Sequence, residues 1–470
     1  MSVEIPRIML AAPRSGGGKT TLVCGLLQAL VDAGHTPAAF KCGPDYIDPL
    51  FHRRIVGAAS GNLDLFFTGE QRARELLARG ATGCDIAVLE GVMGYYDGVT
   101  GAGTKGSSYH VARATESPVV LVLQARGAAL SLAALVRGFA GFREDANIRG
   151  VILNKCTRRG YGAARECIER ETGVEVLGYV PEDARFAIES RHLGLVTADE
   201  VAGLKRKVAQ VAHALRESVA LERLVQIARS APALSERPYR CEPLDGARGL
   251  SLAYARDEAF CFYYEENLRM LEDLGVRLAP FSPLADEPLP QGVSGLYLGG
   301  GYPELHCQRL AASGRTRASV RAAVCAGLPT IAECGGFMYL QQSIEDEDGT
   351  SWPMAGALPG VSRNAHHLEN FGYAQATAPR DTMLLQRGES VNMHEFHYWA
   401  SSEEGDALHA VKPSGSSWEC MVCTPSLQAG YPHIYYPGNP AMLRRFVRAM
   451  AAWRRGAGEG ACACTEGAGR

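Results

Sequence analysis

The chain has 470 residues, of which 46% are hydrophobic and 21% are charged, and its formal net charge is −3. This length is too great for one hydrophobic core, so two or three domains are expected. The nearly balanced charge gives no electrostatic support for a nucleic-acid partner. Fourteen cysteines are scattered through a chain whose N-terminus lacks a signal-peptide pattern, which favours the reducing cytoplasm. No apolar run approaches the roughly 18 residues of a membrane span, so we expect a soluble protein with no membrane partner.

A strand, a glycine-rich loop and a helix are predicted by residues 7–21, RIMLAAPRSGGGKTT. The backbone N–H groups of such a loop turn toward phosphates, Lys19 can reach the β/γ-phosphates, and the Thr20 hydroxyl can ligate Mg²⁺. Pro13 stands where the strict GxxxxGK[ST] pattern has its first glycine, so the match is incomplete. We predict ATP binding rather than a loop that merely caps a helix. The predicted cofactor-binding residues are Gly16, Gly17, Gly18, Lys19, Thr20 and Thr21.

An irregular loop follows the next predicted strand, at residues 41–52, KCGPDYIDPLFH. Its prolines prevent regular structure, and catalytic or metal-binding groups often lie on such loops. Acidic residues beside Gly and Pro also suit ordinary turns. Because the loop comes soon after the phosphate-binding pattern, we predict that Asp45, Tyr46 and Asp48 bind substrate and that Asp48 also binds Mg²⁺.

Three further polar residues stand at or after buried strands. Glu90 ends the apolar run DIAVLE, the usual place for a Mg²⁺-binding carboxylate beside a phosphate loop. Asp97, in the glycine-rich loop that follows, could orient substrate or metal or could form a turn. Asn154 ends the strand GVILNK, where its amide could pair with adenine.

Strands and helices alternate throughout, which predicts α/β domains with a doubly wound parallel sheet in the first. The segment SAPALSERPYRCEPLDGARG is rich in proline and has little periodicity, so it reads as a linker. We predict a first domain at 1–230, a linker at 231–248, a second domain at 249–455 and a disordered, low-complexity tail at 456–470.

Cys334 lies between an apolar strand and an apolar helix in AECGGFMYL. This order matches a nucleophile elbow, in which a sharp turn exposes the thiol and the helix N-terminus lowers its pKa. Buried structural cysteine is the ordinary alternative and suits most of the other thirteen. The pair Cys420 and Cys423, and the pair Cys462 and Cys464, lack the partners of a zinc site.

Two histidine-bearing segments follow. The segment NMHEFHYW lacks the HExxH metal spacing, so we predict a strand with polar residues that face a site. His433 lies in a strand-like stretch, LQAGYPHIYYPG, and sequence alone does not place it near Cys334.

The chain closely resembles the cobyrinic acid a,c-diamide synthases, which join a dethiobiotin-synthetase-like ATPase domain to a class I glutamine amidotransferase domain. The matching segments span nearly the whole chain and are APRSGGGKTT, KCGPDYIDPLFH, NLDLFF, EGVMGYYDG, GSSYHVAR, AFCFYYEENL, LYLGGGYPEL, AECGGFMYL, HEFHYW and AGYPHIYY. The resemblance implies that ATP phosphorylates the a and c acetate carboxylates of a cobalt corrin and that ammonia from glutamine displaces each phosphate. A homodimer is compatible with this resemblance.

The resemblance also assigns roles in the second domain. It implies that Cys334 attacks the glutamine amide and that His433 serves as its base and acid. Backbone N–H groups near Gly300, Gly301 and Gly335 would bind the oxyanion and so contact the substrate. Tyr435 stands where class I amidotransferases usually carry a Glu, and Ala332 stands where many relatives carry Gly.

Related activities remain as alternatives. Nickel-sirohydrochlorin and hydrogenobyrinic acid a,c-diamide synthases perform the same chemistry on other rings, and cobyric acid synthase amidates four other positions. A partition-type ATPase would need a membrane-targeting helix or a basic surface and would have no use for Cys334.

Overall fold

The structure is a computed structural model that describes residues 3–186 and 198–466, with side chains described for 3–186 and 201–456. Its contacts divide the chain into two compact units, Met1–Tyr239 and Arg240–Arg470, which we describe separately. This division falls within the range predicted as a linker, and the outer domain limits stay predictions. Among the described residues, no helix combines the length and the apolar character needed to cross a membrane.

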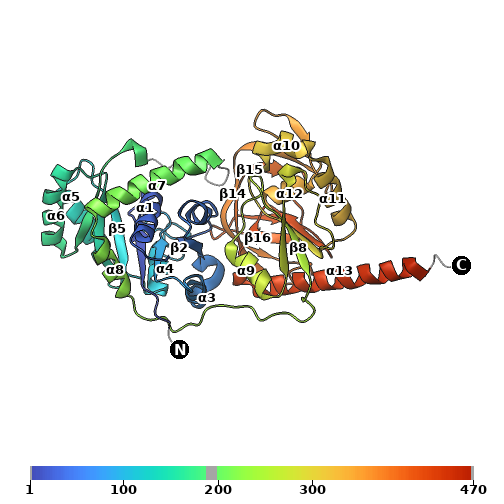
Figure 1. Ribbon diagram of the computed structural model, residues 1–470, viewed down its shortest axis with the longest axis horizontal. Coiled ribbons are helices and arrows are strands. Elements are labelled where there is room, and N and C mark those ends of the chain that lie inside the picture. The colour runs from blue at the N-terminus through green and yellow to red at the C-terminus, as the bar shows by residue number, and fades with distance from the viewer. Residues whose placement is uncertain (1–2, 187–197, 467–470) are drawn as a thin grey trace. The chain divides into compact units, whose positions relative to one another are not determined.

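The first unit is built on a seven-stranded sheet in the order β3-β2-β4-β1-β5-β6-β7 (Figure 1), and every neighbouring pair of strands is parallel. The central strands are buried on both faces, which is why they read as short apolar runs without alternation. The strands are β1 (Arg7–Ala11), β2 (Pro37–Cys42), β3 (Ala59–Leu63), β4 (Ile86–Glu90), β5 (Val119–Gln124), β6 (Ile148–Asn154) and β7 (Val176–Val180).

Both faces of this sheet carry helices. Ile8 of β1 packs in a hydrophobic cluster with α1, α7 and α8. On the opposite face, the Arg7 guanidinium donates to the Thr115 carbonyl directly after α4, and Phe40 of β2 lies against Gly80 of α3. The predicted doubly wound α/β arrangement is therefore confirmed. The helices are α1 (Lys19–Asp32), α2 (Ile47–Phe51), α3 (Leu65–Gly80), α4 (Ser108–Ala114), α5 (Leu130–Gly141), α6 (Arg158–Thr172), α7 (Ala198–Ser218) and α8 (Leu221–Arg229).

The second unit also has a mainly parallel sheet, in the order β18-β19-β11-β10-β8-β9, with only β18 antiparallel. Helices of this unit are α9 (Glu265–Asp273), α10 (Cys307–Ala312), α11 (Gly314–Cys325), α12 (Gly335–Leu340) and α13 (Pro440–Glu466). The strands of the parallel sheet are β8 (Ser251–Ala255), β9 (Arg277–Phe281), β10 (Gly295–Leu298), β11 (Thr330–Glu333), β18 (Val422–Thr424) and β19 (Leu427–Gly430).

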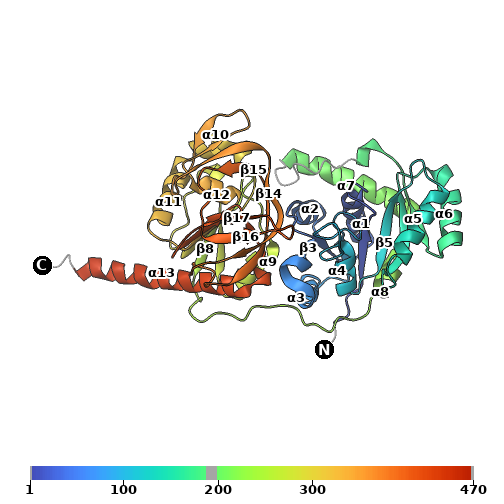
Figure 2. The same cartoon turned by 180° about the vertical axis from the view of Figure 1, so that it is seen from behind.

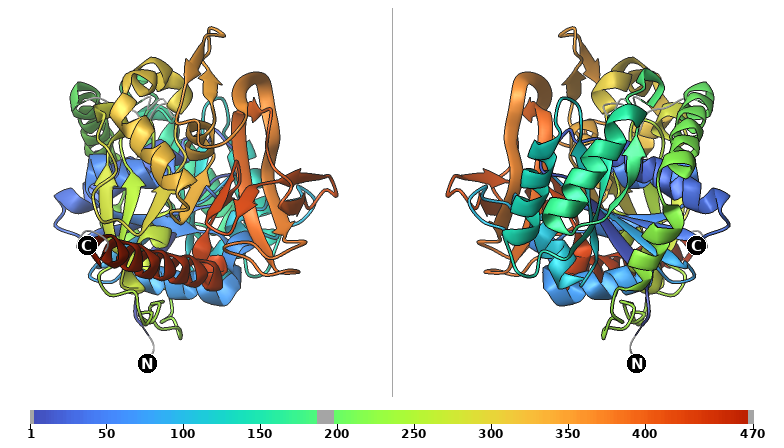
Figure 3. Two further views of the ribbon diagram at one scale, coloured as in Figure 1. Left: turned by 90° about the vertical axis from the view of Figure 1, so that its right-hand side faces the viewer. Right: turned by 90° about the vertical axis from the view of Figure 1, so that its left-hand side faces the viewer.

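A further, mainly antiparallel sheet completes the second unit, and we did not predict it as a separate sheet. Its longest pair, β14 and β15, forms the long curved orange hairpin of Figure 3, and β16 and β17 extend it (Figure 2). The segment NMHEFHYW lies in β15, as a strand, in agreement with its prediction. The strands are β12 (Ser343–Glu345), β13 (Ser351–Pro353), β14 (Val361–Thr377), β15 (Ser390–Ser401), β16 (Leu408–Val411), β17 (Ser417–Cys420) and β20 (His433–Ile434).

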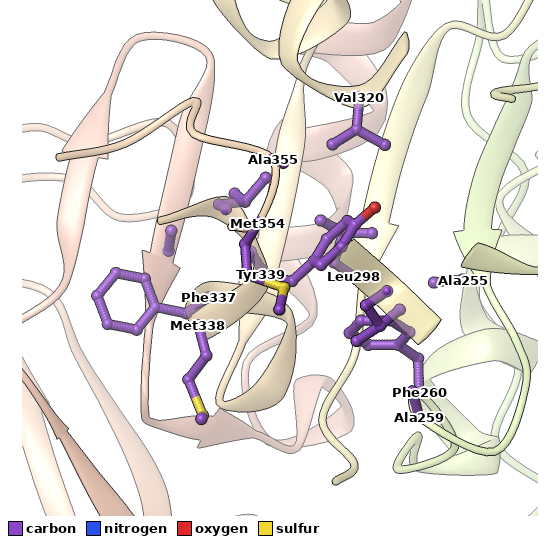
Figure 4. Close-up of a cluster of buried hydrophobic side chains, with 14 of the residues drawn as sticks. Ala255, Ala259, Phe260, Leu298, Val320, Phe337, Met338, Tyr339, Met354 and Ala355 are labelled. Carbon is purple, nitrogen blue, oxygen red and sulfur yellow. The ribbon is translucent and has the colours of Figure 1, made fainter. Parts of the chain in front are cut away.

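Helix α12 lies at the centre of the main hydrophobic cluster of the second unit (Figure 4). Its side chains reach in different directions: Phe337 packs edge-on against Tyr431, with ring centroids 5.3 Å apart, and Tyr339 packs against Phe260 at the same separation. Gly336 allows the helix to approach β10, because a Cβ there would lie 2.2 Å from the Leu298 carbonyl oxygen. The cluster therefore fixes the helix that follows Cys334.

Two pairs of consecutive helices are separated by short breaks. Val219 separates α7 from α8 and bridges to Gly178 of β7, and Ser313 separates α10 from α11. Helix α13 continues to Glu466 and so covers most of the tail predicted as disordered, while residues 467–470 lie outside the described residues.

Replacing Phe337 with Ala should destabilise the second unit by about 3–5 kcal/mol, because the side chain is fully buried and its removal leaves a cavity. All four tryptophans, Trp352, Trp399, Trp418 and Trp453, belong to this unit, so urea unfolding followed by tryptophan fluorescence reports on it. Phe396→Ala is the matched control, because this phenyl ring is 50% exposed. The control should change the unfolding free energy by less than about 0.5 kcal/mol. Equal effects of the two substitutions would contradict the central position of α12.

Candidate active sites

The phosphate loop joins β1 to α1 at the carboxyl edge of the first sheet. Gly16 and Gly18 have φ of +72° and +86°, a region that favours glycine. A Cβ at Gly18 would also lie 2.3 Å from Asn154 Nδ2, and that amide donates to the Gly17 carbonyl over 3.1 Å. The structure therefore brings Asn154, from the end of β6, against the loop.

Lys19 is buried at the start of α1, and its Nζ donates to the Met93 carbonyl over 2.6 Å. Burial and the nearby Lys41 ammonium lower the pKa of Lys19 to about 8, although the surrounding carboxylates partly oppose this shift. A phosphate chain at the loop would offer this ammonium a stronger acceptor than a carbonyl.

A cleft of about 390 Å³ opens beside the loop, at the carboxyl ends of β6 and β7. This volume suits a small organic ligand, and parallel α/β sheets commonly bind ligands at this edge. Its lining residues include Gly16, Gly18, Thr21, Asn154, Lys155, Asp183 and Phe186. Apart from the predicted Gly16, Gly18, Thr21 and Asn154, these positions carry no sequence pattern that would have identified them.

A buried ion network lies next to the loop. Strand register pairs Glu90 of β4 with Lys41 of β2, and Lys41 Nζ lies 2.8 Å from Glu90 Oε1 and forms an ion pair with Asp48. The Thr20 hydroxyl donates to Glu90 Oε1 over 2.6 Å and lies 3.5 Å from Asp48 Oδ2. The structure thus brings the three predicted metal-binding residues, Thr20, Asp48 and Glu90, together, and the two carboxylates share one ammonium.

The carboxylates of this network titrate differently. Burial raises the pKa of Glu90 to about 7, against the attraction of Lys41. The Lys41 ammonium, together with other contacts, keeps the pKa of Asp48 below its ordinary value despite burial. Although burial disfavours its charge, Glu90 and Asp48 raise the pKa of Lys41 well above its ordinary value. Sequence reasoning missed Lys41 and the buried His52, which lies 3.6 Å from Glu90; the signal for Lys41 was a charged residue that ends a buried strand.

The other predicted substrate-binding residues surround this network. Asp45 accepts the backbone N–H groups of Ile47 and Asp48, at 2.8 and 3.0 Å, and so orders the start of α2; burial raises its pKa to about 6. Tyr46 is the half-buried residue that precedes α2. Asp97 accepts the Gly94 N–H over 3.1 Å, in a turn packed against the phosphate loop. Asp45 and Asp97 therefore have turn-forming contacts whatever further role they have.

In the second unit, Cys334 occupies a strained turn between β11 and α12, with φ of +48°. A non-glycine residue rarely adopts this φ, and such strain is typical of a nucleophile elbow. Its backbone N–H donates to the Gly430 carbonyl over 2.8 Å, which ties the turn to β19. The predicted elbow conformation is therefore present.

The predicted lowering of the thiol pKa is wrong in direction. Burial and the nearby Glu304 carboxylate raise the pKa of Cys334, and the Gly335 N–H opposes them only partly. Helix α12 has only six residues, so its dipole stabilises a thiolate only weakly. The apolar cluster that surrounds the thiol opposes this stabilisation. The thiol consequently needs a proton acceptor.

Glycine residues pack between the Cys334 turn and His433. A Cβ at Gly335 would lie 3.2 Å from the Gly301 nitrogen, and a Cβ at Gly300 would lie 2.5 Å from His433 Cε1. Close packing at these positions excludes larger residues. The structure thus gathers the predicted Gly300, Gly301 and Gly335 between the predicted nucleophile and its histidine.

The backbone around His433 is held by an asparagine. Asn267 is buried, donates to the Ile434 carbonyl over 2.8 Å and accepts the Tyr436 N–H over 2.9 Å. Tyr435 packs edge-on against Tyr264, with ring centroids 4.9 Å apart. These contacts fix the backbone that follows His433. Tyr435 stands there in place of the usual glutamate.

Comparison with known proteins agrees with this division. Residues 8–196 match the family described as CobQ/CobB/MinD/ParA nucleotide binding domain, and residues 251–440 match the CobB/CobQ-like glutamine amidotransferase domain. The fold and the two clusters therefore define a nucleotide-binding domain joined to a glutamine amidotransferase domain.

Relatives match the chain over nearly its full length. The cobyrinate a,c-diamide synthase of Caldanaerobacter subterraneus subsp. tengcongensis is 38% identical over 453 residues, which cover 95% of this chain and 99% of that protein. Proteins of the same name from Dehalococcoides mccartyi and Priestia megaterium are 38% and 36% identical, and these alignments cover 95% and 96% of this chain and 98% of each relative. The chain belongs to the cobyrinate a,c-diamide synthase family.

Two buried histidines of the second unit should each lower its stability as the pH falls below about 6.5, the ordinary histidine pKa, whereas Glu304 and Glu333, whose pKa burial raises to about 8, act in the opposite direction. Burial lowers the pKa of His433 to about 3 and that of His394, opposite it on β15, to about 4. The unfolded chain therefore binds more protons between pH 4 and 6.5, and each histidine costs up to about 1.4 kcal/mol per pH unit as the pH falls through this window.

Urea unfolding followed by tryptophan fluorescence at pH 7 and pH 5 isolates the contribution of His433 when the wild type is compared with a variant that lacks this histidine. His433→Gln should lose less stability on acidification than the wild type. His409→Gln, at an exposed histidine on β16, is the control and should behave as the wild type does. If the wild type and His433→Gln respond equally to pH, the buried neutral state of His433 is contradicted.

Proposed function

We propose that the protein is an ATP- and glutamine-dependent synthase that amidates the a and c acetate carboxylates of cobyrinic acid in cobalamin biosynthesis. Family membership over nearly the whole chain supports the activity. The observation that carries the mechanism is the presence of two separate chemical sites, a phosphate loop with a buried ion network and a strained cysteine turn. A carboxylate needs activation and ammonia needs a source, so the overall reaction requires two half-reactions.

In the first half-reaction, Gly16 to Thr21 bind the phosphates of ATP, and the cleft beside Asn154 holds its base and ribose. Lys19 exchanges the Met93 carbonyl for the transferring phosphoryl group and compensates its charge. The activated species is an acyl phosphate on the substrate carboxylate, and ammonia displaces phosphate from it to leave the amide.

A magnesium ion fits the chemistry of the donor set, because Thr20, Asp48 and Glu90 present only oxygen atoms. Glu90 Oε2 accepts no hydrogen bond from any described residue. Within the described part of the chain, no group of three or more His, Cys, Asp or Glu could hold a metal by itself, so phosphates would supply further ligands. When bound, magnesium would neutralise charge on the phosphates.

The loops around the network bind the substrate carboxylate in this proposal. Asp45 and Tyr46 flank the start of α2, and Asp97 lies in the turn against the phosphate loop. Lys41 holds the Asp48 and Glu90 side chains in fixed positions near the transferring group. These residues then orient the acceptor oxygen toward the γ-phosphate.

In the second half-reaction, His433 accepts the thiol proton of Cys334 as the sulfur attacks the glutamine amide carbon. The backbone N–H groups of Gly301 and Gly335 stabilise the oxyanion, in keeping with the close packing of the two residues, since a Cβ at Gly335 would lie 3.2 Å from the Gly301 nitrogen. His433 then protonates the leaving nitrogen, ammonia departs, and water hydrolyses the thioester to glutamate. Because burial raises the pKa of Cys334, deprotonation is coupled to the attack in this proposal.

The curated relatives favour cobyrinic acid over the nickel-sirohydrochlorin and hydrogenobyrinic rings. A reducing cytoplasmic location is supported by buried free thiols such as Cys24, Cys42 and Cys156.

Cys334→Ser should abolish glutamine-dependent amidation while ammonium chloride at alkaline pH restores the diamide, because free ammonia bypasses the thiol. The matched variant Glu90→Gln should lose activity with either nitrogen source, by about 10²-fold or more, because it acts in the other half-reaction. Mass spectrometry of products from cobyrinic acid and other tetrapyrrole polycarboxylates measures both. Full glutamine-dependent turnover by Cys334→Ser, or ammonia rescue of Glu90→Gln, would refute the assignment.

A further inference from the structure

An aromatic row runs along one face of the β14–β15 hairpin, which Figure 3 shows as the long curved orange ribbon. Its rings contact one another edge to face: Tyr373 with His394, His394 with Phe371, Phe371 with Phe396, and Phe396 with Tyr398. Successive centroids are 5.4–6.2 Å apart. We call these five residues the aromatic row.

The strand register places the row on a single face. His394, Phe396 and Tyr398 alternate along β15, and alternate residues of a strand share a face. Tyr373 lies directly opposite His394. Phe371 lies at a register shift in β14, where a bulge re-aims the side chain, and there it joins the rings of β15.

Three of the five rings are exposed, whereas His394 is buried. Phe371, Phe396 and Tyr398 are 48%, 50% and 44% exposed, and no other large aromatic side chain in the described part of the second unit is exposed. The opposite face of β15 packs inward through Glu395, His397 and Trp399, which are buried. The core therefore does not require the aromatic row.

Polar groups flank the row at both ends. At one end Gln375 donates to Asn392 across the strands. At the other end Arg363 is paired with Ala400 in register, on the face that carries Tyr398, and its side chain is 70% exposed. The rings of β15 span four residues, or about 14 Å. The surface thus combines a strip of edge-to-face rings with an exposed guanidinium, which lies 3.7 Å from the Glu345 carboxylate and has further N–H groups that can bind a second carboxylate.

We propose that the aromatic row binds one face of a flat conjugated macrocycle that carries carboxylate arms, with Arg363 holding one arm. This inference rests on the proposed function, which supplies a substrate of that shape. A broad ring can lie across several aromatic side chains at once, and its acidic arms extend beyond the apolar strip. The row is also continuous with the amidotransferase site, because His394 lies directly opposite His433.

The test uses the full chain with Phe396→Ala and Tyr398→Ala combined, and equilibrium dialysis of cobyrinic acid followed by its absorbance. The dissociation constant should rise about tenfold, since two contacting rings are lost. Phe396→Tyr with Tyr398→Phe keeps both rings and should retain wild-type binding. Phe142→Ala, which removes an exposed phenyl ring from the first unit, is the matched control.

The KM values for ATP and glutamine report on general damage to either site, and they should not move with the dissociation constant. An unchanged dissociation constant in the double variant, with a wild type that still amidates cobyrinic acid, overturns this inference and leaves the proposed function intact. A wild type that binds neither cobyrinic acid nor any other tetrapyrrole polycarboxylate overturns both. Dissociation of an oligomer by the double variant, with ring binding unchanged, would show that a second copy covers the row and would also overturn the inference.

Discussion

The first site depends on the Lys41 ammonium, which lies between the Asp48 and Glu90 carboxylates in a buried setting. An isolated buried carboxylate costs several kcal/mol, so two such groups beside a phosphate-binding loop require a cation. The parallel register of β2 and β4 supplies it, because it pairs Lys41, near the end of β2, with Glu90 at the end of β4. Thr20 joins the same carboxylate from the start of α1. The sheet order therefore determines the electrostatics of the site.

The second site depends on close packing rather than on charge. Gly300, Gly301, Gly335 and Gly336 let β10, α12 and the His433 segment approach each other where any side chain would collide. The close packing that positions Cys334 also buries its thiol, and this burial raises the thiol pKa. Cys334 therefore depends on a proton acceptor. The two sites thus differ in their electrostatics, because the first stabilises existing charges and the second forms a charge only during the reaction.

Local chemistry explains what the sequence could predict. The phosphate loop and the Cys334 elbow are continuous strand, turn and helix segments, so glycine positions and apolar runs were sufficient. Lys41 was missed because its role arises from the pairing of β2 with β4, which no local pattern encodes. The thiol pKa was predicted in the wrong direction because burial by distant segments outweighs a short helix dipole. The β14–β15 hairpin was missed as a sheet because its bulges and many polar residues break a simple alternation.

The central claim is that the first unit activates a carboxylate by phosphorylation before ammonia arrives. Cobyrinic acid labelled with ¹⁸O in its carboxylates tests this directly, with mass spectrometry of the inorganic phosphate released during glutamine-dependent turnover. Transfer through an acyl phosphate moves one labelled oxygen to phosphate for each amide formed. Unlabelled phosphate together with labelled AMP, or amide formation without label in phosphate, would contradict the account.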